Sequence, residues 1–193
     1  IPIAVFKGPV TAVESYDALN DRPFNDLDLL VGHSHAQEAV DLLEELGFQP
    51  VNELPRNFEG RYSLPFDDPQ GNANGYELYI GSGRLRVDLH WDLTGRYFAF
   101  PLDVNELFDR RTTVVINGKP VPTFAPEDTL LILCAHGAKH EWTRIRFVCD
   151  IARFVQNHPD LDWDTVIQRA ESIDSERMLT LALDLAQILL DVP

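Results

Sequence analysis

The residues best suited to chemistry are two aspartates, Asp26 and Asp28, which flank Leu27 in a run that stays apolar to Val31. In an extended strand the side chains at positions i and i+2 share a face, so both carboxylates are expected to project together, away from Leu27 and Leu29. Like charges this close raise each other's pKa unless a cation lies between them. Oxygen ligands suit magnesium, manganese or calcium. The pair predicts a divalent-metal site; the alternative is the hydrated end of a strand in an acidic protein.

A third carboxylate, Asp88, lies in a segment where polar and apolar residues alternate. The polar residues at every second position are Arg84, Arg86, Asp88, His90 and Asp92. This period of two indicates a strand with one polar face, which we expect to line the same site as Asp26 and Asp28. Three carboxylates from neighbouring strands are able to hold two divalent ions, activate a hydroxyl and clamp a triphosphate. The alternative is a water-exposed sheet face with cross-strand ion pairs.

A turn at Lys7 and Gly8 is a candidate phosphate site. It connects an expected strand at residues 1–6 to an expected helix at residues 10–20, and Pro9 suits the first helical turn. The free N–H groups at such a helix start are able to receive a phosphate. The alternative, which the spacing alone favours, is an ordinary strand-to-helix connection.

The densest cationic region lies in the second half of the chain. His136, Lys139 and His140 are spaced to share one helix face, and Arg144 and Arg146 follow. We expect these residues to form a phosphate- or base-binding wall that faces the aspartates across a cleft. The alternative is that the two histidines pair within a helical core, for example with Asp150.

Other residues near these motifs have simpler interpretations. A zinc site is disfavoured at the two histidines because Gly137 stands where a metalloprotease helix has glutamate. Arg22, before the acidic strand, is expected to position a carboxylate or bind a phosphate. Asp150 is expected to form an ion pair within its own helix, with Arg146 or Arg153.

The rest of the pattern predicts the elements that position these residues. Strands are expected at 1–6, 26–31, 48–51, 76–80, 85–93, 112–116 and 120–124, with turns at 81–83 and at 117–118, where Asn-Gly indicates a hairpin. Helices are expected at 10–20, 34–46, 103–109, 125–141, 144–157, 162–173 and 175–191. Residues 52–74 predict a long loop or irregular hairpin. The second helix is expected to begin at Ser34 and end at Gly47, with an apolar face of Ala39, Leu42, Leu43 and Leu46.

The character of the chain changes after residue 124. The 193 residues suffice for one domain with a large core or for two small ones. We expect an α/β domain over residues 1–124 and a helical C-terminal subdomain over residues 125–193, which gives an α+β fold.

Composition narrows the class of protein. The net charge of −15 argues against broad binding to nucleic acid, although a local basic pocket remains compatible with a nucleotide or an RNA end. No apolar run approaches the length of a membrane span. The two cysteines, Cys134 and Cys149, are expected to be buried free thiols, which fits a reducing cytoplasm. The abrupt start and end predict that the chain is part of a longer protein.

These motifs together resemble the uncharacterised nucleotidyltransferase family of the DNA-polymerase-β-like nucleotidyltransferase superfamily. The resemblance covers nearly the whole chain and rests on the order strand, glycine turn, helix, Asp-x-Asp strand and third acidic strand. The matching segments are Phe6-Lys7-Gly8-Pro9, residues 22–31, Val87-Asp88-Leu89-His90-Trp91 and residues 134–140, followed by Arg144 and Asp150.

The resemblance implies a mixed sheet with flanking helices, then a helical bundle, and a metal-dependent transfer of a nucleoside monophosphate from a nucleoside triphosphate to a hydroxyl. Asp26 and Asp28 would bind Mg²⁺ or Mn²⁺, and Asp88 would complete the site and help deprotonate the acceptor. The acceptor would be a small molecule, a protein or an RNA end. Lys7-Gly8 replaces the Gly-Ser turn of the wider superfamily, and Lys7 would supply a point charge to a phosphate instead.

Two other functions remain open from the sequence. One is a catalytically degenerate module that keeps the fold and binds a partner, as an antitoxin does; the altered turn favours it, and the intact aspartates argue against it. The other is a glycosyltransferase that holds a nucleotide-sugar through its Asp-x-Asp, although that fold needs longer alternation of strands and helices.

Overall fold

The computed structural model describes residues 1–50, 59–65, 84–94 and 98–192, and the account below concerns these residues. The strands are β1 (Ile3–Val5), β2 (Leu27–Val31), β3 (Gln49–Pro50), β4 (Glu59–Pro65), β5 (Arg84–His90), β6 (Thr112–Ile116) and β7 (Lys119–Thr123). The helices are α1 (Gly8–Ser15), α2 (Ala36–Glu45), α3 (Val104–Asp109), α4 (Pro126–Lys139), α5 (Ile145–Asn157), α6 (Trp163–Ser172) and α7 (Glu176–Leu190). Short 3-10 turns occupy Leu19–Asp21 and His33–His35.

The main sheet has the strand order β1-β2-β5-β4-β3, and β6 and β7 form a separate hairpin. The central strands β2 and β5 run parallel, in a register that pairs Asp28 with Asp88 and Leu29 with Leu89. Neighbouring residues of paired strands point to the same face of a sheet. The register therefore places Asp28 and Asp88 side by side on one face.

The two faces of the sheet contact different parts of the chain. On one face, Val31, Val87 and Leu89 pack with Ala39 and Leu43 of α2. On the other face, Ala4, Phe6 and Leu30 belong to a larger core that is shared with the C-terminal helices. Burial of these alternating apolar side chains is what fixes which residues face the helices.

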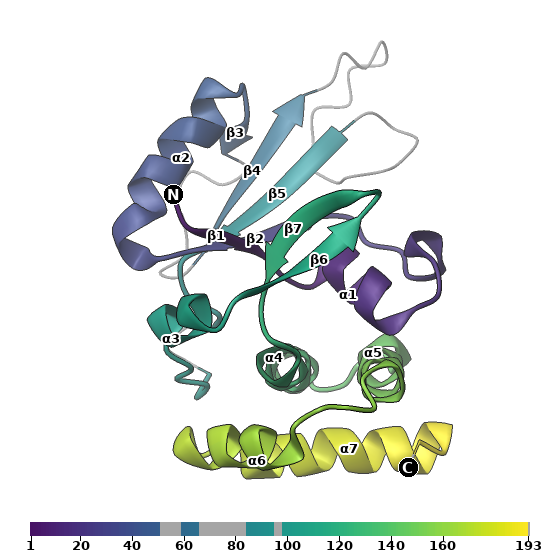
Figure 1. Cartoon of the computed structure of the whole chain (residues 1–193). Helices are drawn as coiled ribbons and strands as arrows, with labels where there is room; N and C mark the ends of the chain where they lie inside the picture. Colours follow the sequence, from purple (N-terminus) through teal and green to yellow (C-terminus); the bar gives the residue numbers. More distant parts are fainter. Residues whose placement is uncertain (51–58, 66–83, 95–97, 193) are drawn as a thin grey trace.

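The C-terminal helices form two layers under the sheet. Figure 1 shows α4 and α5 beneath the strands, with α6 and α7 as a further layer below them. The larger core runs through both layers, from Phe6 near the sheet to Ala182 and Ala186 of α7. None of the described helices is long and apolar enough to cross a bilayer.

Most expected elements are present. The C-terminal helices begin and end within a few residues of the expected positions, and the hairpin turn at Asn117 and Gly118 has φ angles of 49° and 75°. Positive φ at both central residues is what a two-residue hairpin turn requires, so the Asn-Gly prediction is confirmed. Cys134 and Cys149 are free thiols, of which Cys134 is buried and Cys149 is partly buried.

Some local predictions were wrong. Ser34 lies inside a 3-10 turn and does not cap α2, whose N-cap residue is His35. On α2, Leu42 and Leu46 are 45% and 68% exposed, because only the side of the helix that carries Ala39 and Leu43 meets the sheet.

The middle of the chain also differs from expectation. The helix expected at 10–20 ends at Ser15, before a separate 3-10 turn, and the strand expected to reach residue 93 ends at His90. Strand β4 forms within the segment expected to be a loop or irregular hairpin. The expected strand at 76–80 and turn at 81–83 lie outside the described residues.

Candidate active site

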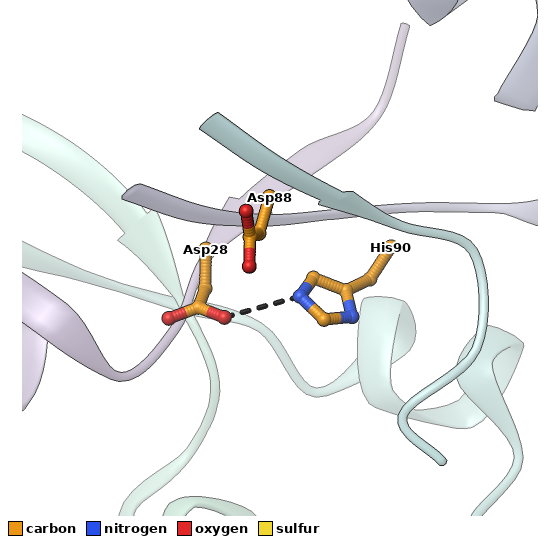
Figure 2. A group of neighbouring side chains, drawn as sticks. All are labelled: Asp28, Asp88 and His90. Atoms are coloured by element: carbon orange, nitrogen blue, oxygen red, sulfur yellow. Dashed lines mark hydrogen bonds and ion pairs between the residues drawn. The ribbon is translucent and has the colours of Figure 1, made fainter. Parts of the chain in front are cut away.

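Three side chains from β2 and β5 meet at the centre of the sheet. Asp28, Asp88 and His90 are 6%, 5% and 3% exposed, and each offers a ligand atom within 4.8 Å of the others. Figure 2 shows the two carboxylates and the imidazole turned toward one another. In the described part of the chain this is the one group of acidic, histidine or cysteine side chains close enough to share an ion. Carboxylate oxygens and one imidazole nitrogen make a donor set that fits a divalent cation.

Asp28 is held by two basic groups. Its Oδ1 lies 2.7 Å from Nζ of Lys7 and 3.0 Å from Nε2 of His90. Burial alone would raise the pKa of Asp28, but the charge of Lys7 and the hydrogen bond and charge of His90 outweigh it and hold the pKa well below its usual range. Asp28 is therefore a carboxylate, even though it is buried.

Asp26 and Asp88 share a second basic partner, Arg86. The Arg86 guanidinium donates from Nε and Nη2 to the two Asp88 oxygens at 3.0 and 3.1 Å, and its Nη2 lies 3.7 Å from Asp26. The pKa of Asp26 is raised, first by burial and then by the charges of Asp28 and Asp88. The raised pKa is the response expected of an acid that is partly buried beside other acids.

The Lys7-Gly8 turn lies against the same acids. Lys7 and Gly8 both have positive φ angles, 57° and 43°. A Cβ on Gly8 would lie 3.1 Å from the carbonyl oxygen of Asp26, so glycine is needed both for its φ and for this approach. The turn directs the Lys7 side chain back over the ring of Phe6 toward Asp28.

The end of α4 forms the opposite wall. The rings of His136 and His140 lie 4.7 Å apart, and both pack against Phe147 of α5. The pKa of His136 is lowered well below its usual value, first by burial and then by the charge of Lys7. Gly137 has a packing role, because a Cβ there would overlap the ring of Trp142.

Arg22 joins Asp150 of α5 to the start of α1. Arg22 donates from Nε and Nη2 to Asp150 at 2.7 and 2.8 Å and from Nη1 to the carbonyl of Gly8 at 3.3 Å. The hydroxyl of Tyr16 also donates to Asp150. The pKa of Tyr16 is raised, first by burial and then by the charge of Asp150. The prediction of an ion pair within α5 was wrong for Asp150, and so was its pairing with the histidines, because Arg22 and Tyr16 take it instead.

The acids and the basic residues of both walls border one cavity of about 580 Å³. Its lining includes the candidate metal- and nucleotide-binding residues of the sequence analysis: Lys7, Gly8, Arg22, Asp26, Asp28, Asp88, His136, Lys139 and His140. The acids lie on the sheet side and the histidines and Lys139 on the helical side. Their shared lining means that these residues can act on one ligand.

The lining also includes Arg86 and His90, which the alternation along β5 had placed on the face of Asp88, and Arg144 and Arg146, which were expected in the basic wall. Sequence reasoning did not select four other lining residues, Phe24, Asn25, Thr143 and Phe147. Arg144 and Arg146 flank the start of α5, and Nη1 of Arg146 donates to the carbonyl of Pro23 at 3.4 Å.

Comparison with known proteins agrees with this architecture. The model of a family described as "Uncharacterised nucleotidyltransferase" matches residues 1–191. No sequence among the curated proteins matches the chain.

Two solved structures are similar over most of their length. An antigenic nucleotidyltransferase-like protein from Paracoccidioides brasiliensis is 21% identical, with a TM-score of 0.50 over 94% of this chain and 84% of that one. ANT(2")-Ia in complex with adenylyl-2"-tobramycin is 13% identical, with a TM-score of 0.51 over 91% of this chain and 88% of that one. At these identities the likeness concerns the fold alone, and it confirms the α+β, polymerase-β-like architecture.

Proposed function

The chain belongs to the uncharacterised nucleotidyltransferase family, and from that premise we propose that it moves a nucleoside monophosphate from a nucleoside triphosphate to a hydroxyl acceptor, with a divalent metal ion. The observation that carries the proposal is the cavity, in which three acids face a basic wall. Phosphoryl and nucleotidyl transfer depend mainly on positioning and on charge stabilisation, and this arrangement has the groups for both.

In this proposal the acids hold the metal and receive the proton. Asp28 and Asp88 bind Mg²⁺ or Mn²⁺ together with His90, the group whose ligand atoms lie close enough to share an ion. Asp26, which borders the same cavity, is assigned to the metal as well, from the Asp-x-Asp motif of the family. The bound ion would lower the pKa of the acceptor hydroxyl and neutralise charge on the reacting phosphate. Asp88, which lies beside Asp28 on the neighbouring strand, is assigned the proton of that hydroxyl from the role of the third acid in the family, and Arg86 has to release one of its oxygens for this.

The basic residues hold the triphosphate. Lys7 and the N–H groups at the Gly8 turn approach it from the start of α1, and His136, Lys139 and His140 approach it from the end of α4. Arg22 supports the turn through the carbonyl of Gly8 while it lines the cavity. The acceptor is a small molecule, a protein or an RNA end. Because Cys134 and Cys149 are free, a cytoplasmic setting is part of the proposal.

The test is transfer of label. The protein is incubated with each α-labelled nucleoside triphosphate, Mg²⁺ or Mn²⁺ and a cell extract, and pyrophosphate release and label in an acceptor are followed. We expect both, and we expect Asp28→Asn to abolish them while circular dichroism shows an unchanged fold. Asp164→Asn, which removes an exposed carboxylate at the start of α6, is the matched control and should transfer label at the normal rate.

Three results would separate the alternatives. Normal turnover in Asp28→Asn would refute the site assignment. Metal-dependent binding of a sugar nucleotide, without label transfer, would favour the glycosyltransferase. Absence of any metal-dependent nucleotide binding would favour a degenerate binding module.

A further inference from the structure

The ion pair between Lys7 and Asp28 uses a carboxylate oxygen that a metal ion would need. Lys7 Nζ lies 2.7 Å from Asp28 Oδ1, and the two side chains are only 15% and 9% exposed. The same oxygen lies 3.0 Å from Nε2 of His90, as Figure 2 shows. A divalent ion held by Asp28, Asp88 and His90 therefore competes with an ammonium group that is already in place.

Of the two basic groups at this oxygen, Lys7 is the one that can leave. His90 lies on the central strand β5, and its ring packs edge-on against Phe6 with 5.1 Å between centroids. Lys7 carries its charge on a flexible four-carbon stem and lines the cavity of about 580 Å³. Its backbone is anchored by the turn at Gly8, so the side chain is able to move without any change in the sheet.

A displaced Lys7 needs an anion, because the far side of the cavity is also positive. Lys139, Arg144 and Arg146 line that side. Moving an ammonium from a carboxylate toward other cations is unfavourable in a partly closed space. A phosphate group in the cavity removes this cost, since it gives Lys7 a new partner of opposite charge.

We propose that Lys7 is an internal counter-ion that couples metal binding to nucleotide binding. It neutralises Asp28 in the nucleotide-free protein, and it moves to a phosphate oxygen of the triphosphate when nucleotide and metal bind together. This inference rests on the proposed function and adds to it a coupling between the metal and the nucleotide. Coupling between two ligands is reciprocal, so each should raise the affinity for the other.

The test uses the full chain with Mn²⁺ and inorganic tripolyphosphate, which avoids any assumption about the base. Electron paramagnetic resonance of free Mn²⁺ gives the affinity of the protein for Mn²⁺ alone. Calorimetry gives its affinity for tripolyphosphate alone, measured in EDTA, and for the Mn²⁺–tripolyphosphate complex. For the wild type we expect weak binding of Mn²⁺ alone and mutual enhancement of at least about tenfold. For Lys7→Met we expect Mn²⁺ alone to bind about tenfold more tightly, and the enhancement to shrink to less than about threefold.

Further variants separate this role from a general effect of charge. Lys7→Gly removes the amine and also suits the positive φ, so it should reproduce Lys7→Met if the latter folds poorly. Lys119→Met makes the same change at an exposed position of β7 and should leave all three affinities unchanged. Lys139→Met should weaken tripolyphosphate binding but change the affinity for Mn²⁺ alone by less than about threefold, because Lys139 lies on the opposite wall.

The outcomes distinguish this inference from the function beneath it. Equal Mn²⁺ affinity in the wild type, Lys7→Met and Lys7→Gly would overturn the counter-ion role and leave nucleotidyl transfer standing. If Mn²⁺ binding in none of these proteins depended on Asp28, so that Asp28→Asn left it unchanged, both the counter-ion role and the proposed function would be overturned.

Discussion

Arg22 connects the turn at Lys7 and Gly8 to the C-terminal helices. Its guanidinium joins Asp150 of α5 to the carbonyl of Gly8, and both partners of the ion pair are almost completely buried. A buried acid that loses its only guanidinium partner keeps the cost of burial without the compensation. The position of the turn thus depends on Arg22. None of the hydrogen bonds described for Arg22 goes to Asp26, Asp28 or Asp88.

Arg22→Gln should lower the free energy of unfolding by about 3–5 kcal/mol, because it leaves Asp150 buried beside Tyr16 alone. Urea unfolding followed by circular dichroism measures this. Arg153→Gln removes the same charge from an exposed position on α5 and should change stability by less than about 0.5 kcal/mol. A loss in Arg22→Gln as small as that of the control would show that the pair contributes little.

Glu14 is a second residue whose environment has a measurable consequence. It lies on α1, which packs against α5 and β6, and its Oε2 is buried without a hydrogen-bond partner among the described residues. Burial raises the pKa of Glu14 to about 8. The folded protein therefore favours the neutral form of this side chain up to a much higher pH than the unfolded chain does.

Stability should depend on pH through this group. The contribution of Glu14 to the free energy of unfolding is fully present below its ordinary pKa of 4.5. It is lost as the pH rises through about 8, because the carboxyl ionises at a lower pH in the unfolded chain than in the folded protein. The side chain of Glu14→Gln cannot ionise. The unfolding free energy of this variant, relative to that of the wild type, should therefore grow by a few kcal/mol between those limits, because each unit of difference between the folded and unfolded pKa corresponds to about 1.4 kcal/mol. Unfolding free energies of both proteins across this range measure the effect; parallel pH profiles would contradict it.

At the scale of elements, the end of α4 is shaped by Gly137, which the sequence analysis used only as an argument against a zinc site. Gly137 lies against the ring of Trp142, and the N–H of Trp142 donates to the carbonyl of Gly137 at 3.0 Å. The chain turns sharply here, with positive φ at Glu141 and Trp142. This turn holds His136, Lys139 and His140 at the cavity.

Gly137→Ala should displace Trp142 and lower the unfolding free energy by about 1–3 kcal/mol, the usual cost of overpacking. It should also weaken binding of tripolyphosphate, because the basic wall moves with the turn. Gly32→Ala is the control: its added Cβ would meet His35 at an ordinary 3.7 Å, and its φ is negative. Chemical unfolding and calorimetry give both quantities. Equal behaviour of the two variants would show that the turn tolerates a Cβ.

The sequence predicted the elements whose signals are local. Alternation along β5 and the Asp-x-Asp of β2 were enough to put Asp28 and Asp88 on polar faces, and the parallel register then brought those faces together. Asn117-Gly118 specified its hairpin through backbone preference alone.

What could not be predicted depends on distant partners. Arg22 and Asp150 are 128 residues apart, and either alone has several plausible partners within its own helix or loop. Leu42 and Leu46 belong to an apolar stripe on the helix that is wider than its contact with the sheet. The pattern alone could therefore not show that these two leucines stay exposed. The pairing of Lys7 with Asp28 likewise needed the geometry of the Gly8 turn.

At the scale of the whole molecule, one core passes through the boundary expected at residues 124 and 125. Phe124 is fully buried, and its ring packs at an angle against Phe6, which follows β1, and edge-on against Phe108 of α3. The same core continues into α4 and α7. The division into an α/β domain and a helical subdomain remains a proposal about organisation. The shared core indicates that the two parts depend on each other for stability.

We therefore expect residues 1–124 and 125–193 to unfold together. Far-ultraviolet circular dichroism and tryptophan fluorescence should give coincident urea transitions for the full chain. A fragment of residues 1–124 should lack a cooperative transition, because Phe6, Leu30 and Phe124 lose the helices that cover them. Two separated transitions in the full chain would mean that the parts are independent domains.

The parallel pairing of β2 with β5 ties correct folding to chemical competence. A shift of one strand by a single residue would turn Asp28 or Asp88 toward the apolar side and bring leucines into the cavity in its place. The mispaired chain would have to bury a naked carboxylate, so it could not persist as a stable near-native form. Formation of this sheet and alignment of the two acids are therefore one event.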